Sequence, residues 1–86
     1  MYTLIFDREV EKFLKKQEKA VRLRIRNALL ELAENPYQAT DVKRLKEREK
    51  QFRKRVGDYR IIYELVDNQL IILVLRIASR GNVYKD

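Results

Sequence analysis

The hydrophobic residues change their spacing partway along the chain, and this change limits the fold more than any other feature. Between residues 18 and 34 they recur every three or four positions, which is the spacing of one face of a helix. From Phe52 onward hydrophobic and polar residues alternate, as in a strand with one buried face. Because the helical spacing and the strand alternation occupy separate segments of the chain, they predict an α+β fold with helices packed on one face of a sheet.

The first half of the chain predicts one strand and two helices. Residues 2–6 are rich in β-forming side chains, and Asp7 can cap a helix that follows them. A second helix over residues 18–34 ends before Pro36, because proline disfavours α geometry in the residue before it. The two helices form a helical hairpin. Their apolar positions are Val10, Phe13 and Leu14 in the first helix and Val21, Ile25, Ala28, Leu29 and Leu32 in the second.

The second half predicts three strands after a polar loop at residues 37–51. Gly57-Asp58 is a hairpin signal, and a further turn is expected at Asp67-Asn68. Residues 70–78 are apolar almost throughout, which is typical of a strand buried on both faces. Residues 1–86 are therefore expected to form a single domain of order β-α-α-β-β-β: an antiparallel β-sheet with an N-terminal α-helical hairpin packed on one face.

The hairpin at Gly57-Asp58 fixes the faces of the two strands beside it. A two-residue turn places Arg55 directly opposite Arg60, and alternation puts Arg53 on the same face. Lys54 falls on the core side, where its side chain is expected to extend outward to solvent. The residues expected to face the helices are Phe52, Val56, Tyr59, Ile61, Tyr63 and Leu65, and Ile62 and Glu64 are expected beside the arginines.

The opposed arginines predict a binding site for an anion. Like charges directly opposite in a sheet have Cβ atoms about 4.5–5.5 Å apart and destabilise it. A bound anion relieves the repulsion between Arg55 and Arg60, and guanidinium groups suit phosphate because they donate paired hydrogen bonds and stay ionised. The alternative is a face that is charged only because it meets solvent. With only Glu64 as a nearby acid, we favour the phosphate site.

The face of the last strand depends on the length of the turn before it. A two-residue turn at Asp67-Asn68 directs Arg76 and Arg80 towards the helices. A three-residue turn shifts the register by one, so that Arg76 faces Arg60 and Arg80 joins the arginine side. Burying Arg76 without an acid is costly, which favours the longer turn. Pairing of Arg76 with a helix carboxylate is the alternative.

Composition limits the chemistry and the partners. The chain has no cysteine and no histidine, which excludes disulfides and thiolate metal sites and removes the most common general base. We therefore expect neither a metal nor a cofactor. The net charge is +7, and residues 43–60 contain nine basic and three acidic side chains. This concentration favours a polyanionic partner, either nucleic acid or an acidic protein.

The N-terminal residues do not resemble a signal peptide, since a short apolar run is followed at once by charges. The longest apolar run, residues 70–75, is too short to cross a bilayer. We therefore expect a cytoplasmic protein without a membrane partner.

Two C-terminal motifs resemble those of the RelE/ParE toxin superfamily. Residues 56–63 read Val-Gly-Asp-Tyr-Arg-Ile-Ile-Tyr, and residues 75–84 read Leu-Arg-Ile-Ala-Ser-Arg-Gly-Asn-Val-Tyr. Together with the length, the charge and the helical hairpin, they make the chain similar to RelE-like mRNA interferases of type II toxin–antitoxin systems. The layout of that superfamily is the β-α-α-β-β-β order expected here.

The resemblance implies an endoribonuclease toxin that enters the ribosomal A site, cleaves messenger RNA there and is neutralised by a RelB-like antitoxin. An antitoxin helix is expected in the groove between helices and sheet, with acidic residues on the arginine face. By position, the resemblance assigns catalysis to Arg60, Arg80 and Tyr84, and phosphate binding to Arg53 and Arg55. The further basic residues expected to bind RNA are Lys43, Arg44, Lys46 and Lys54.

The implied reaction is attack of a ribose 2′-OH on the phosphodiester, for which histidine is absent. Tyr84 is the family's candidate base, and neighbouring arginines favour its phenolate. Arg60 and Arg53 would hold the phosphate, and Arg80 would stabilise the departing oxygen rather than give up its tightly held proton. Because such a site is slow alone, we expect weak cleavage of free RNA and a large contribution from positioning by the ribosome.

Two other functions compete with RNA cleavage. A ParE-like toxin of the same fold would inhibit DNA gyrase by binding, without catalysis. A simple nucleic-acid-binding module would use the basic segment only for phosphate affinity, with steep salt dependence and no reaction products.

Overall fold

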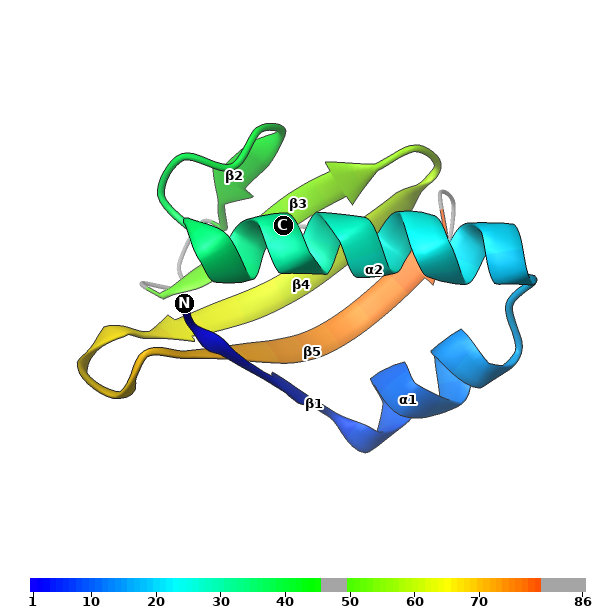
Figure 1. Ribbon diagram of the computed structural model, residues 1–86, viewed down its shortest axis with the longest axis horizontal. Coiled ribbons are helices and arrows are strands. Elements are labelled where there is room, and N and C mark those ends of the chain that lie inside the picture. The colour runs from blue at the N-terminus through cyan, green and yellow to red at the C-terminus, as the bar shows by residue number, and fades with distance from the viewer. Residues whose placement is uncertain (46–49, 80–86) are drawn as a thin grey trace.

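The computed structural model describes residues 1–45 and 50–79, and these form two helices and five strands (Figure 1). Each predicted helix and strand is present, and a short strand lies within the segment predicted as a loop. The order is β-α-α-β-β-β-β. The elements are β1 (Thr3–Phe6), α1 (Arg8–Lys15), α2 (Lys19–Glu34), β2 (Val42–Arg44), β3 (Gln51–Val56), β4 (Tyr59–Val66), the 3₁₀ turn η1 (Asp67–Gln69) and β5 (Ile71–Ser79).

The five strands form one mixed sheet in the order β1-β5-β4-β3-β2. The predicted antiparallel pairing is confirmed for β3 with β4 and for β4 with β5, and β2 adds antiparallel to β3. The prediction was wrong for β1, which pairs parallel to β5. The two helices carry the chain away from the end of β1, so this strand is free to pair with a distant partner in either direction. An alternating pattern alone cannot distinguish these directions.

The helix ends follow the expected signals. Asp7 caps α1, because its Oδ1 accepts a hydrogen bond of 2.9 Å from the Glu9 amide. Helix α2 begins after Glu18 without a side-chain cap and ends at Glu34, with Asn35, the residue before Pro36, as its C-cap. No helix in residues 1–45 and 50–79 is long and apolar enough to cross a membrane.

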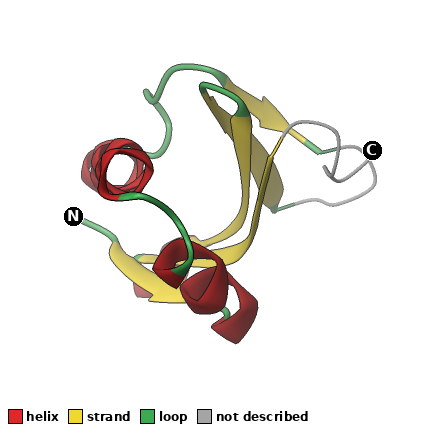
Figure 2. Cartoon of the chain, turned by 90° about the vertical axis from the view of Figure 1, so that its right-hand side faces the viewer, coloured by secondary structure: helices red, strands yellow, loops and turns green. Residues whose placement is uncertain are grey.

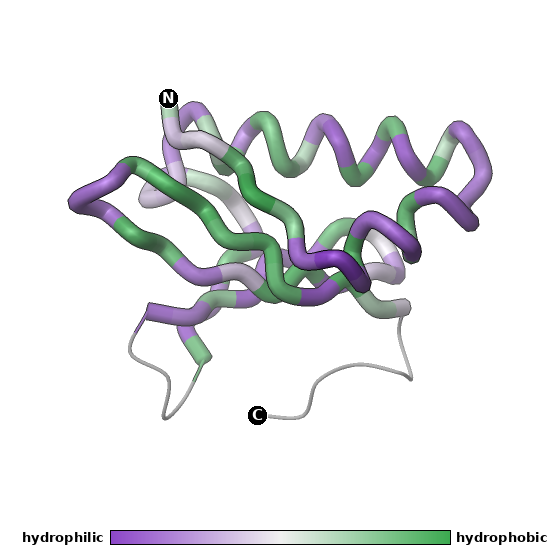
Figure 3. Tube along the Cα trace, turned by 90° about the horizontal axis from the view of Figure 1, so that it is seen from below, coloured by the Kyte–Doolittle hydropathy of each residue, from purple (hydrophilic) through white to green (hydrophobic). Residues whose placement is uncertain are grey.

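The sheet curves around α2, which lies along its concave face (Figure 2). In Figure 3 the helices alternate between hydrophilic and hydrophobic residues, whereas long hydrophobic stretches follow the strands. The expected division of faces is confirmed, because Ile61, Tyr63 and Leu65 of β4 belong to the core cluster that includes the buried residues of α2. Phe52, Val56 and Tyr59 pack against this cluster, whereas Ile62 is buried outside it. The buried core is formed by Val10, Ile25, Leu29, Leu32, Ile61, Tyr63, Leu65, Ile72, Val74 and Ile77.

Lys54 lies on the helix side of β3, as predicted, but it does not extend outward to solvent. Its side chain is 5% exposed, and its Nζ lies 3.0 Å from Glu31 Oε1 and 2.8 Å from the Thr40 carbonyl oxygen. The Lys54 ammonium lowers the pKa of Glu31 below its ordinary value. A buried cation is stable here because Glu31 of α2 places a carboxylate within hydrogen-bonding distance of the Lys54 ammonium. The two residues are 23 positions apart in the sequence.

The turn before β5 is longer than either predicted form. Val66 pairs with Ile71, so four residues lie between them, and Leu70 closes the turn in the left-handed conformation with φ 53°. A β-bulge follows, because Tyr63 pairs with Val74 whereas Ile62 pairs with Arg76. Arg76 therefore does not face Arg60 as predicted. At Arg76 the register of β5 against β4 is therefore shifted by two residues from the register that a three-residue turn would give. A shift of two residues keeps a side chain on the same face of the sheet, so Arg76 still lies on the predicted face.

A small cluster of hydroxyl groups fixes the same turn from outside. The Tyr2 hydroxyl donates a 2.6 Å hydrogen bond to Asp67, and the Tyr37 hydroxyl donates to the other carboxylate oxygen. These bonds lower the pKa of Asp67 and raise the pKa of Tyr2 to about 12. The cluster ties the start of β1 and the loop after α2 to the β4–β5 turn.

Candidate anion-binding site

The β3–β4 hairpin has the register that the sequence predicted. Val56 pairs with Tyr59, and Arg55 lies opposite Arg60. Gly57 has φ +57°, whereas Asp58 does not have a positive φ, as in a type II′ turn with glycine first. The Arg24 guanidinium from α2 packs against Gly57, so a side chain at this position would also meet a neighbour.

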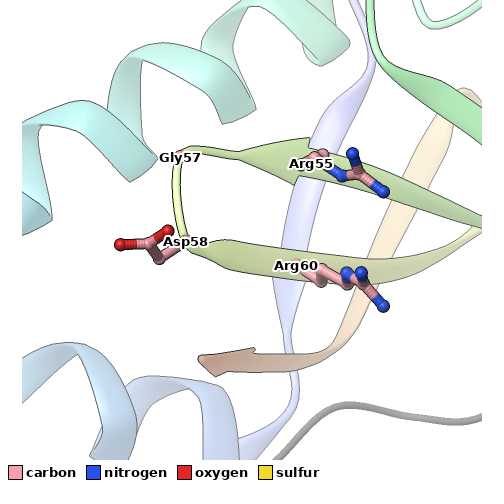
Figure 4. A pocket seen from close by; sticks show the side chains of 4 residues that line it. All are labelled: Arg55, Gly57, Asp58 and Arg60. Atoms are coloured by element: carbon pink, nitrogen blue, oxygen red, sulfur yellow. The ribbon is translucent and has the colours of Figure 1, made fainter. Parts of the chain in front are cut away.

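Arg55 and Arg60 form a non-hydrogen-bonded cross-strand pair, which is the more closely spaced of the two kinds of antiparallel pair. The Arg55 amide donates a 3.0 Å hydrogen bond to the Asp41 carbonyl, on the side of the strand away from β4. A pair that is not joined by ladder hydrogen bonds has Cα atoms only about 4.5 Å apart. Both guanidinium groups extend to the same side of the hairpin, whereas Asp58 points the other way (Figure 4). A shallow cavity of about 240 Å³ lies between Arg55, Gly57, Asp58 and Arg60.

A second row of side chains crosses the same face of four strands. Lys43 pairs with Arg53, Arg53 with Ile62, and Ile62 with Arg76. Side chains of directly paired residues share a face, so this row lies beside Arg55 and Arg60 on the side of the sheet away from α2. We call the described cations of this side the basic face: Lys43, Arg53, Arg55, Arg60 and Arg76.

The basic face has little internal neutralisation. Among the residues that the structure describes, Lys43, Arg53, Arg55 and Arg60 form no ion pair. The Arg53 Nε is buried without a hydrogen-bond partner in this part of the chain. Opposed cations without carboxylates repel one another. The arrangement is suited to an anion with several oxygens, such as a phosphodiester, that bridges neighbouring guanidinium groups.

The residues predicted to bind phosphate do not all lie on the same face of the sheet. Arg53, Arg55 and Arg60 share the basic face, and Lys43 joins them because β2 pairs with β3. Arg44 pairs with Phe52 and so belongs to the opposite face, as does the buried Lys54. Lys46, Arg80 and Tyr84 lie outside the described residues.

Two features of this face were not predicted. The role of β2 was missed because a three-residue strand gives almost no periodicity, and residues 42–45, Val-Lys-Arg-Leu, do not alternate between apolar and polar. Gln51 was also missed, and it donates a 3.4 Å hydrogen bond to Glu64 beside the cations. No group of three or more potential metal ligands occurs within residues 1–45 and 50–79.

Solved structures of RelE toxins share this fold. The isolated E. coli RelE toxin matches with a TM-score of 0.82 and 21% identity, over 96% of this chain and 88% of that chain. RelE in the archaeal RelE–RelB complex from Pyrococcus horikoshii OT3 matches with a TM-score of 0.82 and 28% identity, over 95% and 98%. The RelB–RelE complex from Methanococcus jannaschii gives a TM-score of 0.75 and 26% identity, over 94% and 95%.

Sequence comparison gives the family. No curated protein matches the chain. The family model for the ParE toxin of the type II toxin–antitoxin system parDE matches residues 4–84. Since this match spans nearly the whole chain and the fold is that of RelE, the protein belongs to the RelE/ParE superfamily of toxins from type II toxin–antitoxin systems.

Proposed function

We propose that this toxin is a ribosome-dependent endoribonuclease that cleaves messenger RNA in the A site. The observation that carries the proposal is the basic face, where Arg55 and Arg60 stand opposed and Arg53 and Lys43 lie in the next row without carboxylate partners. A face that only inhibits another protein has no need of closely opposed guanidinium groups, whereas a phosphodiester under attack accumulates the negative charge that they stabilise.

The proposed reaction transfers the 2′-OH proton to a base while the 2′-oxygen bonds to phosphorus and the bond from phosphorus to the 5′-oxygen breaks. The products are a 2′,3′-cyclic phosphate and a 5′-OH, which receives a proton. Arg60, with Arg55 and Arg53, stabilises the crowded phosphate. The roles of Tyr84 as base and Arg80 beside the departing oxygen rest on the family resemblance.

The ribosome is proposed to supply what the toxin lacks. The chain contains no histidine, and a tyrosine base with an ordinary pKa of about 10 is mostly protonated at neutral pH. Holding the 2′-OH in line with the phosphate removes a large part of the barrier. The toxin would therefore act in the cytoplasm on ribosome-bound messages.

A RelB-like antitoxin is the proposed regulatory partner, because RelE relatives from P. horikoshii and M. jannaschii were solved in complexes with RelB. A groove of about 430 Å³ between α1, α2 and β1 has an apolar floor and a rim formed by Lys19, Arg22 and Arg26. It suits an amphipathic antitoxin helix with acidic residues along its edge. The apolar lining residues are Phe6, Leu14, Leu23, Ile25 and Leu29.

A translating extract with toe-printing tests the proposed cleavage. Wild-type toxin should produce A-site cuts in the message, and Arg60→Ala should reduce the cutting rate about 100-fold or more, as loss of a charge-stabilising donor does. Arg80→Ala and Tyr84→Phe should reduce it similarly. Arg8→Ala, which removes an exposed arginine of α1, is the matched control and should cut at the wild-type rate.

The match to the ParE family model favours one second candidate, inhibition of DNA gyrase. Intact messages in the extract, together with toxin-dependent DNA breaks by purified gyrase, would support that candidate and reject the nuclease. Salt-sensitive RNA binding with neither product would instead identify a nucleic-acid-binding module.

A further inference from the structure

A third row of side chains crosses the sheet at the far end of the basic face. Gln51 and Glu64 are direct cross-strand partners in β3 and β4. Leu73 pairs with Glu64 on one side, and the Leu45 amide donates to the Gln51 carbonyl on the other. The row therefore reads Leu45, Gln51, Glu64, Leu73, with a polar pair between two leucines. Leu45 is 3% exposed and Leu73 is half-buried.

The polar pair has hydrogen-bonding capacity to spare. The bond from Gln51 Nε2 to Glu64 Oε1 is 3.4 Å long, at the outer limit for such a bond. Glu64 forms no ion pair within the described residues, although it shares a face with the cations. An ionised carboxylate accepts about four hydrogen bonds, and an amide nitrogen donates two. The half-buried pair therefore offers one donor beside two acceptor oxygens.

Glu64 is too far from the opposed arginines to act on the same phosphate. It lies four positions after Arg60 along β4, which corresponds to about 13 Å at the rise of an antiparallel strand. A carboxylate also repels phosphate. The row is thus suited to an uncharged part of the same bound strand, and a base exposed on single-stranded RNA is such a part.

The order of donor and acceptors distinguishes the bases. Guanine presents on its Watson–Crick edge one acceptor, O6, followed by two donors, N1–H and N2–H. Adenine and cytosine place an acceptor beside their single amino donor, and uracil has one donor between two acceptors. A carboxylate facing a base acceptor is repelled, so guanine alone complements Gln51 Nε2 and both Glu64 oxygens.

We infer that Gln51 and Glu64 form a base-reading subsite for guanine in a nucleotide adjacent to the phosphate held by Arg55 and Arg60. This inference rests on the proposed function, since it names a specificity determinant for the same RNA strand. It assigns the two residues to recognition and not to catalysis.

Binding of short RNA by the full chain tests the inference without cleavage. The probes are fluorescently labelled pentanucleotides of uracil with a central guanine, adenine or uracil, and anisotropy gives each affinity. Wild type should bind the guanine probe about tenfold more tightly than the adenine probe, as a bidentate contact to one base does. Glu64→Gln should bring that ratio close to one while strengthening binding of the all-uracil probe, because it removes a negative charge.

Glu34→Gln is the matched control, because it makes the same change of charge at an exposed position of α2. It should leave the guanine-to-adenine ratio unchanged. A wild type without guanine preference, or a Glu64→Gln variant that keeps it, would overturn the inference. These readouts are independent of toe-printing: cleavage without guanine preference would leave the proposed nuclease standing and reject only the subsite.

Discussion

The three consecutive cations of β3 lie in two opposite environments. Lys54 points to the helices, is nearly inaccessible and is held by Glu31 and the Thr40 carbonyl. Arg53 and Arg55 point to the other face, and neither forms an ion pair in the described part of the chain. The pleat, rather than the residue type, thus determines which cation stabilises the fold and which is available to a ligand.

The difference also separates two kinds of energetic cost. On the helix side, the cost of burying a charge is offset within the protein by a carboxylate. On the basic face, the repulsion between Arg55 and Arg60 is left for a partner to offset. Removing a charge from the Lys54–Glu31 pair and removing one from the Arg55–Arg60 pair should therefore change stability in opposite directions.

The largest effect on stability is expected from Glu31→Gln. This substitution leaves the buried Lys54 ammonium without a carboxylate and should reduce the free energy of unfolding by about 2 kcal/mol, measured by urea denaturation. Lys54→Met removes the charge itself and leaves Glu31 half-exposed to solvent, so it should cost less. Equal losses in the two variants would show that Lys54 does not depend on its partner.

The same pair predicts an acid dependence. The pKa of Glu31 is lowered in the folded state by Lys54, so the pair contributes stability above the unfolded-state value of about 4.3. That contribution should be lost as the pH falls through the lower folded-state pKa. Unfolding of Glu31→Gln should lack this component, and an identical acid profile for both proteins would contradict the assignment.

Gly57→Ala should have the next largest effect on stability. Gly57 lies in the turn that determines which cations share a face of the sheet. Alanine at φ +57° is strained, and its methyl group would displace the Arg24 guanidinium. We expect a loss of about 1–2 kcal/mol, measured by thermal unfolding. Asp58→Ala is the control and should change stability little, since Asp58 does not need a positive φ.

On the core side, Tyr63→Phe should stabilise the protein slightly. The Tyr63 side chain is fully buried against Phe52, its hydroxyl has no hydrogen-bond partner among the described residues, and burial raises its pKa. Removing an unsatisfied buried hydroxyl should increase the free energy of unfolding by up to about 1 kcal/mol. A clear loss of stability would mean that the hydroxyl is hydrogen-bonded in solution.

The smallest effect on stability, again a gain, is expected from Arg55→Thr. Threonine suits a strand and removes one of two opposed cations, so the variant should gain about 0.5 kcal/mol at low salt. The gain should shrink as salt screens the repulsion. Arg55→Lys keeps the charge and is the control. A destabilised Arg55→Thr variant at low salt would argue against repulsion on this face.

Short-range signals predicted the hairpin and therefore most of the basic face. The Gly57-Asp58 turn fixes the pairing of Arg55 with Arg60 without any distant contact, and the apolar stripe of α2 identifies the covered face. Relations between distant residues were not predictable in this way. They include the parallel pairing of β1 with β5, the longer turn and the bulge that together move Arg76 from Arg60 to Ile62, and the contact of Lys54 with Glu31.

The salt dependence of RNA binding tests most directly the claim that the unpaired cations form an anion site. The logarithm of the affinity for a single-stranded uracil oligonucleotide falls with the logarithm of salt concentration by about 0.7 per phosphate contacted. Because Arg55 and Arg60 hold one phosphate between them, the Arg55→Ala/Arg60→Ala double variant should have a slope smaller by about 0.7 than wild type, whereas Arg8→Ala/Lys15→Ala on α1 should keep the wild-type slope. Equal slopes for wild type and the Arg55→Ala/Arg60→Ala variant would contradict the account.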